Sequence, residues 1–307
     1  MSARCSLVVN GKSVRIATGD MPVEAALAEG MIAPMSGQGA APAARRLGAR
    51  GHRGEADRLD LPRPSSADAS LLPRRETAPV PQVRRAGTLT QVRALGPRVF
   101  EVVVTLTRRL AYEPGHQVVV TFEGFEPLTL SPTLRVDGAA ELNELVFHLA
   151  RDQGPVAAAL ADGMALGHPV KVKGPVGRGH YRPGGGRLVL VASGTGFAAI
   201  WVIAHAARYI EPAREVVLIA GARDPLDLYM RPSLDWLRAT GLARLVLVAD
   251  RHRQRPPDVR PGPLTAHLPS LRATDVVHVA GDAATVGAVE VLAASVGARC
   301  YPASLGA

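Results

Sequence analysis

Apolar and polar residues follow different patterns along the chain, and the pattern changes near residues 86 and 187. Between these points lie short runs rich in β-branched residues, separated by turn signals such as Glu113-Pro114-Gly115. The runs cover residues 88–94, 100–107, 117–122, 144–148 and 170–173. Five or six short strands at this spacing predict a small antiparallel barrel over residues 86–186.

Residues 187–307 show a second pattern, in which apolar strands alternate with helices. Strands are predicted at 188–192, 216–220, 244–249 and 276–280, and helices at 197–210, 233–240 and 283–296. Fully apolar strands are typical of sheets that are covered on both faces. The order therefore predicts an α/β domain with a doubly wound parallel sheet.

The first 85 residues form two further segments. Residues 6–16 predict two strands joined by an Asn10-Gly11 turn, and residues 21–28 predict a helix with Asp20 as its N-cap. Residues 37–85 are rich in Ala, Arg, Gly and Pro and lack a strand or helix period, so an irregular linker is expected. The predicted organisation is 1–36, 37–85, 86–186 and 187–307.

The net charge of +9 arises largely from the predicted linker. Residues 37–85 hold ten Arg and five acidic residues, and therefore +5 of the total. A basic segment can bind nucleic acid, but this one lacks interleaved aromatic residues and any recognised nucleic-acid module. No nucleic-acid partner is expected.

Cysteine and apolar content exclude several protein classes. The chain contains only Cys5 and Cys300, which excludes a disulfide scaffold and a four-cysteine zinc or iron–sulfur site built by this chain alone. No apolar run approaches the roughly 18–20 residues of a membrane span. The N-terminus also lacks the features of a secretory signal. The expectation is a cytoplasmic protein without a membrane partner.

Six motifs occur in an order that matches one enzyme superfamily. They are Tyr112-Glu113-Pro114-Gly115-His116, Ser131-Pro132-Thr133, Lys173-Gly174-Pro175-Val176-Gly177, Ser193-Gly194-Thr195-Gly196-Phe197-Ala198, Gly221-Ala222-Arg223 with Leu228-Tyr229, and Ala280-Gly281-Asp282. The chain resembles the ferredoxin–NADP reductase superfamily, and more narrowly the reductase components of bacterial multicomponent oxygenases. Those proteins join a plant-type [2Fe–2S] ferredoxin domain to a flavin barrel and a pyridine-nucleotide domain. The resemblance covers residues 86–302 and, more weakly, residues 6–36.

The best-kept motif is the glycine-rich loop at residues 193–196. It lies between a predicted buried strand and a predicted helix, where backbone N–H groups and the helix dipole favour a pyrophosphate. The resemblance implies that Gly194, Thr195, Gly196, Phe197 and Gly281 contact NAD(P)H. It also implies that Arg223 pairs with a ribose or 2′-phosphate, and that Tyr229 lies near the adenosine. A tight turn without a ligand is the alternative, and NADH against NADPH stays open.

The first flavin motif implied by the resemblance is incomplete. The family motif Arg-x-Tyr-Ser corresponds to Leu128-Thr129-Leu130-Ser131. Leu128 replaces the Arg that pairs with the FAD pyrophosphate, and Leu130 replaces the Tyr that stacks on the flavin. Leucine cannot supply a charge-assisted contact. FAD binding is therefore expected to be weakened, and Ser131 and Thr133 stay as candidate contacts.

The second flavin motif is also altered. The family motif Gly-x-x-Ser corresponds to Gly154-Pro155-Val156-Ala157, in which Ala157 replaces the hydroxyl. Gly154 and Val156 stay as candidate contacts at a helix N-terminus. Tyr301 corresponds to the C-terminal aromatic residue that covers the flavin in the family. An empty barrel is the alternative to FAD binding.

The iron–sulfur site implied by the resemblance is missing. The family places four Cys after the first helix, but residues 33–40 hold none. A [2Fe–2S] cluster is therefore not expected. Composition changes sharply at both edges of residues 37–79, and this interval is about as long as the missing remainder of a ferredoxin domain. Our hypothesis is that residues 37–79 are read in a shifted frame or have decayed in sequence.

Two functions follow from the resemblance and its gaps. The first is a flavoprotein reductase that passes a hydride from NAD(P)H to FAD and electrons to an iron–sulfur or oxygenase partner. The alternative is a cofactor-depleted, reductase-like subunit with a binding or scaffolding role. No catalytic side chain is identified, and His148 and His205 are expected to be structural.

Overall fold

The computed structural model describes residues 4–9, 12–17, 81–135, 138–139, 141–250 and 256–304. The chain forms two compact units, Met1–Ala78 and Pro79–Ala307. In the first unit, β1 (Arg4–Val9) and β2 (Lys12–Ala17) pair as an antiparallel hairpin, which confirms the two strands predicted there. The predicted helix at 21–28 and nearly all of the predicted linker lie outside the described residues.

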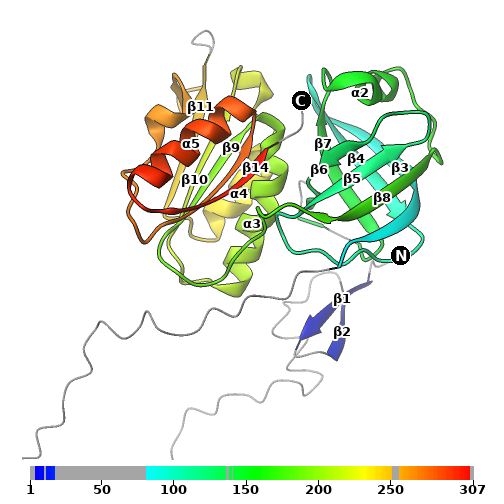
Figure 1. Cartoon of the computed structure of the whole chain (residues 1–307), viewed down its shortest axis with the longest axis horizontal. Coiled ribbons are helices and arrows are strands. Elements are labelled where there is room, and N and C mark those ends of the chain that lie inside the picture. The colour runs from blue at the N-terminus through cyan, green and yellow to red at the C-terminus, as the bar shows by residue number, and fades with distance from the viewer. Residues whose placement is uncertain are drawn as a thin grey trace, which may run out of the picture. The chain divides into compact units, whose positions relative to one another are not determined.

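The second unit begins with a curled antiparallel sheet, the barrel domain, which confirms the predicted barrel (Figure 1). Its strands run in the order β6-β5-β8-β3-β4-β7. The short helix α2 (Gly154–Ala161) covers one end of this sheet. The strands are β3 (Val83–Gly96), β4 (Val99–Leu106), β5 (Gln117–Phe122), β6 (Leu128–Leu130), β7 (Glu144–Ala150) and β8 (Pro169–Val176).

Two strands of the barrel domain differ from the sequence prediction. Strand β3 begins at Val83, so the predicted linker at 37–85 extends too far. Arg84 and Arg85 pair with residues 173 and 172 of β8, and this ladder extends the strand where composition alone favours a linker. Strand β6 has three residues and pairs only with β5, which is too short for a pattern to reveal.

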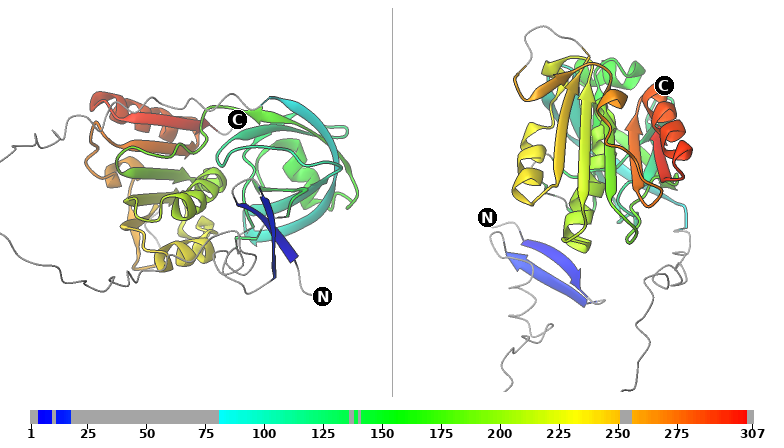
Figure 2. Two further views of the ribbon diagram at one scale, coloured as in Figure 1. Left: turned by 90° about the horizontal axis from the view of Figure 1, so that it is seen from below. Right: turned by 90° about the vertical axis from the view of Figure 1, so that its left-hand side faces the viewer.

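The second half of the unit, the α/β domain, confirms the predicted doubly wound sheet. Six parallel strands run in the order β12-β11-β10-β9-β13-β14, with helices on both faces (Figure 2). The strands are β9 (Leu188–Ser193), β10 (Val216–Ala222), β11 (Arg244–Ala249), β12 (Val259–Pro261), β13 (Val276–Gly281) and β14 (Arg299–Ser304). The helices are α3 (Phe197–Ile210), α4 (Arg231–Ala239) and α5 (Ala283–Ser295). Strands β12 and β14 were not predicted.

Alternate residues of the parallel strands face two separate apolar cores. Leu188 and Leu190 of β9 pack with α3 and α4, whereas Val189 and Val191 pack with α5. All four side chains are fully buried. This two-sided burial explains why the strands are uniformly apolar in sequence. None of the helices in the described ranges is long and apolar enough to cross a membrane.

Helix α3 joins the two domains of this unit. The Thr133 hydroxyl of the barrel domain donates a hydrogen bond to the carbonyl oxygen of Ala198 at 2.7 Å. The Trp201 indole nitrogen donates to the carbonyl oxygen of Arg135 at 3.2 Å. Both contacts lie in the first two turns of α3, so the start of this helix is held by both domains.

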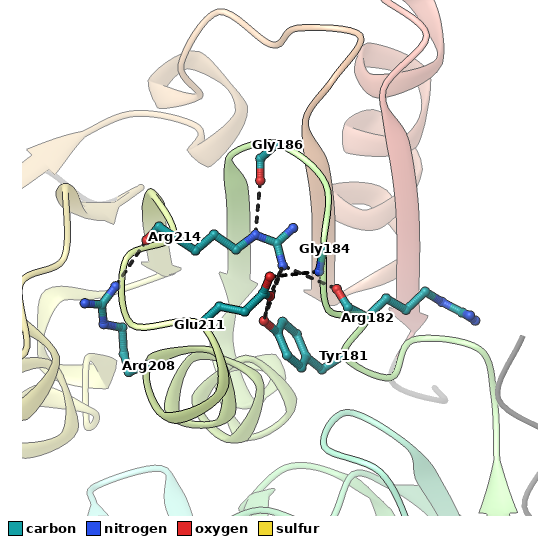
Figure 3. Close-up of polar contacts among 7 residues, drawn as sticks. All are labelled: Tyr181, Arg182, Gly184, Gly186, Arg208, Glu211 and Arg214. Atoms are coloured by element: carbon teal, nitrogen blue, oxygen red, sulfur yellow. Dashed lines mark hydrogen bonds and ion pairs between the residues drawn. The ribbon is translucent and has the colours of Figure 1, made fainter. Parts of the chain in front are cut away.

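The segment between the two domains is held by a buried polar cluster (Figure 3). The Tyr181 hydroxyl donates to the Glu211 carboxylate, which also accepts the backbone N–H of Gly184 at 2.9 Å. Arg214 donates to Glu211 at 2.9 Å and to the carbonyl oxygen of Gly186 at 3.0 Å. Only 5% of the Arg214 side chain is exposed. The cluster therefore fixes the inter-domain segment against the loop that follows α3.

Replacing Arg214 with Ala should destabilise the protein, because it removes one partner of a largely buried ion pair. Such losses typically cost about 3 kcal/mol. We expect the free energy of unfolding in urea to fall by that amount, while Arg238→Ala, which breaks an exposed pair with Asp235, should cost under about 1 kcal/mol. Equal effects of the two variants would contradict this role.

The same cluster predicts an acid-dependent loss of stability. Partial burial alone would raise the pKa of Glu211, but hydrogen bonds from Tyr181, Gly184 and Arg214 outweigh burial and lower its pKa below 4.5. A carboxylate with a lowered pKa stabilises the fold above its unfolded pKa, and the effect is lost as the pH falls through the folded pKa. The stability difference between wild type and Glu211→Gln should therefore be full at pH 6 and shrink below pH 4.5, as measured by urea unfolding.

Candidate functional site: a cleft at the carboxyl end of the parallel sheet

A cleft of about 420 Å³ lies at the carboxyl end of the parallel sheet. Doubly wound sheets bind ligands at this edge, and the volume lies in the usual range for small-molecule sites. It is lined by residues at or just after the carboxyl ends of β9, β10, β11 and β13, by the 263–265 turn and by the start of α5. The polar side chains of the lining are Ser193, Arg223, Asp250, Thr265, Asp282 and Thr285.

The glycine-rich loop at 194–196 turns directly from β9 into α3. Gly194 has a φ of +54°, and a side chain there would meet no atom within 4 Å. Gly196 is the opposite case, because a Cβ there would lie 2.3 Å from the carbonyl oxygen of Ala280. The first glycine leaves the loop open to a ligand, and the second allows the loop to pack against the end of β13.

Ser193 and Asp282 connect two strand ends across one side of the cleft. The Ser193 hydroxyl donates to the Asp282 carboxylate at 2.7 Å. Asp282 also caps α5 by accepting the backbone N–H of Thr285 at 2.8 Å. Burial alone would raise the pKa of Asp282, but these hydrogen bonds outweigh it and lower the pKa. The Asp282 carboxylate is therefore ionised and held in place by hydrogen bonds at one side of the cleft.

Among the residues predicted to contact the nucleotide, Arg223 lines this cleft, whereas Gly194, Thr195, Gly196, Phe197, Gly281 and Tyr229 do not. Phe197 and Tyr229 are buried. Phe197 is fully buried in the core beneath α3 and stacks with Trp201 at 6.4 Å between ring centroids. Tyr229 is 8% exposed, and its hydroxyl hydrogen-bonds Nδ1 of His148 at 3.1 Å. Burial raises the pKa of Tyr229 and lowers that of His148 to about 3, so both groups are neutral at pH 7. The pair joins the α/β domain to β7, which fits the structural role expected for His148.

The barrel domain holds a buried hydroxyl without a partner. Ser131 is 4% exposed, and its hydroxyl has no hydrogen-bond partner among the described residues. An isolated antiparallel bridge joins Thr133 to Val146 of β7. His148 lies further along β7, and its Nε2 also has no hydrogen-bond partner within the described ranges. Two unsatisfied polar atoms thus lie at the junction of the domains.

Two leucines occupy the positions at which the resemblance implies Arg and Tyr. Leu130 is 2% exposed and belongs to the apolar core of the barrel domain, and Leu128 packs against that core. Val156 and Ala157 of α2 are also buried, so their side chains belong to the interior of the barrel domain. Gly154, at the start of α2, has a φ of +77° and open space beside it.

Tyr301 lies on the edge strand β14, where its ring contacts the side chains of Arg182 and His278. The Arg182 guanidinium lies over its ring, 4.7 Å from the centroid, and the His278 ring stacks against it at 5.2 Å. These two contacts fix the position of the Tyr301 ring.

The comparisons with known proteins agree with this architecture, although no family model matches the chain. The chain is 34% identical to the aromatic O-demethylase reductase subunit of an Amycolatopsis strain over 174 residues, which is 54% of this chain and 49% of the relative. It is also similar to a solved Amycolatopsis cytochrome P450 reductase, with a TM-score of 0.63, 28% identity and coverage of 72% and 69%. The ferredoxin reductase in carbazole 1,9a-dioxygenase has the same fold, with a TM-score of 0.63, 20% identity and coverage of 73% and 70%.

The chain resembles reductases of the ferredoxin–NADP reductase superfamily in sequence and in fold. It spans about half the length of the curated relatives it matches. In fold, the barrel domain matches the flavin-binding-type barrel of these structures and the α/β domain matches their nucleotide-binding-type domain.

Several residues of the site lie outside the sequence motifs or gain their role only from the fold. Asp250 and Thr265 line the cleft, but neither lies in a motif, and Thr265 comes from a short 3₁₀ turn far from the glycine-rich loop in sequence. Asp282 was visible in the Ala280-Gly281-Asp282 motif, yet its bond to Ser193 requires the ends of β9 and β13 to be adjacent. Only the sheet order supplies that information.

Two glycine variants should show that Gly196 is closely packed and that Gly194 has free space beside it. Gly196→Ala forces a backbone shift against Ala280, and overpacking of this kind costs about 1–3 kcal/mol. Gly194→Ala meets no atom and bears only the cost of its positive φ, about 1 kcal/mol. Urea unfolding should rank Gly196→Ala as the less stable variant, and the reverse order would contradict the close packing of the loop on β13.

Proposed function

We propose that this chain is an NAD(P)H-dependent flavoprotein reductase that passes electrons to an iron–sulfur or oxygenase partner. The observation that carries the proposal is the open glycine-rich loop at the carboxyl edge of the parallel sheet. Helix α3, which follows this loop, is hydrogen-bonded to the flavin-type barrel domain. The relatives named as reductase subunits favour this function over a cofactor-depleted scaffolding subunit. The chain spans only part of the length of these relatives, so its activity and partners are proposals.

The nucleotide would be held by the glycine-rich loop and by residues of the adjacent cleft, in distinct roles. Backbone N–H groups at Gly194, Thr195 and Gly196 bind the pyrophosphate at the start of α3. Arg223, exposed on the rim of the cleft, supplies the positive charge for the ribose or 2′-phosphate. Asp282 holds Ser193 and keeps this wall in place, and Gly281 allows the ends of β9 and β13 to meet.

The barrel domain fits a flavin at two points and departs from the family at two others. The unpartnered Ser131 hydroxyl and the open N-terminus of α2 at Gly154 suit a flavin ring and its diphosphate. Leu128 and Leu130 supply neither the guanidinium nor the aromatic ring. FAD, when bound, accepts a hydride from NAD(P)H and releases single electrons. The protein would contribute orientation, and we expect weaker FAD binding than in relatives with the full motif.

The purified protein tests this function directly. After incubation with FAD and desalting, the sample should show a flavin absorbance band, and NADH or NADPH should bleach it under anaerobic conditions. The reduced protein should then reduce a neutral quinone. A colourless protein that neither retains FAD nor oxidises NAD(P)H would overturn the proposal.

Restoring the missing charge should strengthen FAD binding. Leu128→Arg places a guanidinium at the position of the family arginine, and one charge-assisted contact is worth roughly a tenfold change in affinity. Flavin fluorescence titration should therefore give a dissociation constant about tenfold lower than that of wild type. Val291→Arg, which adds the same charge on the exposed side of α5, is the matched control and should leave the affinity unchanged. An equal effect of both variants would show a general charge effect.

A further inference from the structure

The charged side chains that line the cleft are divided between two sides of strand β9. Among the described lining residues, these side chains are Arg223, Asp250 and Asp282. Arg223 follows β10 and Asp250 follows β11, and both strands lie on one side of β9. Asp282 follows β13, which pairs with the other side of β9. The cleft therefore has a base and an acid on one side and the Asp282 carboxylate on the other.

The strand order of the parallel sheet reverses between β9 and β13. From β9 the strands follow one another outward as β10, β11 and β12, and the chain then returns to β13 and β14 on the other side of β9. A doubly wound sheet binds a dinucleotide across this point, with one half on each side. The proposed function places the adenosine ribose at Arg223. The nicotinamide half therefore belongs on the side of β13 and Asp282.

The Asp282 carboxylate is held by hydrogen bonds from two elements. The backbone N–H and the hydroxyl of Thr285 both donate to it at 2.8 Å. The Ser193 hydroxyl donates to it from the end of β9 at 2.7 Å. Capping of α5 accounts for the bonds from Thr285, but not for the bond from Ser193. The bond from Ser193 holds the carboxylate between the ends of β9 and β13, where the glycine-rich loop begins.

A fixed carboxylate distinguishes the two redox states of a nicotinamide ring. The dihydronicotinamide ring of NAD(P)H is neutral. Loss of a hydride to the flavin acceptor removes one proton and two electrons and leaves the ring with one positive charge. A negative charge beside the ring attracts this cation much more strongly than the neutral ring. The attraction also grows during the transfer, because the positive charge develops as the hydride leaves.

We propose that Asp282 stabilises the positive charge that the nicotinamide ring gains on hydride loss, and that the cleft thereby favours the oxidised nucleotide over the reduced one. This inference rests on the proposed function for the presence of the nicotinamide. It adds a role to Asp282, which the proposed function uses only to hold Ser193. The diphosphate is bound separately, by backbone N–H groups at the start of α3.

Two other roles of Asp282 lead to different binding behaviour. A residue that only caps α5 would affect the oxidised and the reduced nucleotide equally, because their rings differ in charge and hardly in size. A carboxylate that acted on the diphosphate would repel every ligand with that group, whether or not the ligand has a nicotinamide ring. Selectivity for the charged ring therefore separates the proposed role from both alternatives.

The test compares Asp282→Asn with Asp250→Asn in the full-length protein. Both variants remove one negative charge from the cleft, but from opposite sides of β9. Asn caps helices as well as Asp does, so the first variant keeps the start of α5. The probes are NAD⁺, tetrahydro-NAD, whose ring is neutral and donates no hydride, and ADP-ribose, which lacks the nicotinamide. Isothermal titration calorimetry gives the dissociation constant of each probe, with and without a 2′-phosphate.

We expect Asp282→Asn to weaken the binding of NAD⁺ relative to tetrahydro-NAD about tenfold, because one charge interaction is lost. Asp250→Asn should change this ratio less than about twofold, because its charge lies on the adenosine side. An unchanged ratio in Asp282→Asn would overturn the inference. It would indicate repulsion of the diphosphate if the affinity for all three probes rose together, and a capping role if none changed. An equal change of the ratio in both variants would also overturn the inference.

Ser193→Ala provides a second test that leaves the carboxylate in the chain. Alanine keeps the Cβ that lies against Gly281 and removes the hydroxyl that holds Asp282. NAD⁺ should again bind more weakly relative to tetrahydro-NAD, by about threefold, because one hydrogen bond to the carboxylate is lost. If Asp282→Asn does not fold, an unchanged ratio in Ser193→Ala overturns the inference by itself.

Binding to the wild-type protein separates this inference from the proposed function. If no probe binds with or without the 2′-phosphate, the nucleotide site is absent and both proposals fail. If the probes bind and the ratio does not depend on Asp282, only this inference fails. If the ratio depends on Asp282 but the protein neither retains FAD nor reduces quinone, the reductase proposal fails and the role of Asp282 in nucleotide binding stands.

Discussion

The close approach of two strand ends, β9 and β13, controls the geometry of the candidate site. A Cβ at Gly196 would collide with the backbone at Ala280, and a Cβ at Gly281 would lie 2.6 Å from that of Ser193. Because neither position has room for a side chain, the backbone after β9 packs directly on the end of β13. That contact sets the start of α3, brings Ser193 to Asp282 and opens the cleft on the side of Arg223.

Helix α3 transmits this arrangement to the barrel domain. Its first turns accept a hydrogen bond from Thr133 and donate one to Arg135, while the loop after its last turn holds the inter-domain segment through Glu211 and Arg214. The two domains are therefore attached at both ends of one helix. The proposed reductase function requires the nucleotide and the flavin to be held in a fixed relative position, and a rigid helix attached to both domains would provide it. On the barrel side, Leu128 and Leu130 add to the apolar core where the family has a cation and an aromatic ring, so the proposed flavin site depends on Ser131 and on the start of α2.

The amino-acid sequence by itself determined the class of fold and the position of the glycine-rich loop. Apolar runs marked β9, β10, β11 and β13, because strands buried on both faces must be apolar throughout. The motif order was sufficient to predict the resemblance to the ferredoxin–NADP reductase superfamily. The start of β3 and the short β6 escaped prediction, because strand pairing with β8 and β5, and not local composition, creates them.

Tertiary structure alone decided which residues share the site. Phe197 and Tyr229, both motif residues, are buried in the core and at the domain junction, whereas Asp250 and Thr265, which belong to no motif, line the cleft. Strand register likewise brings distant residues together, since Arg84 and Lys173 are 89 positions apart in sequence and directly opposite in the sheet. The pattern of apolar residues in one segment indicates which of its side chains are buried. Which distant segments pair with each other is decided only when the whole core is packed.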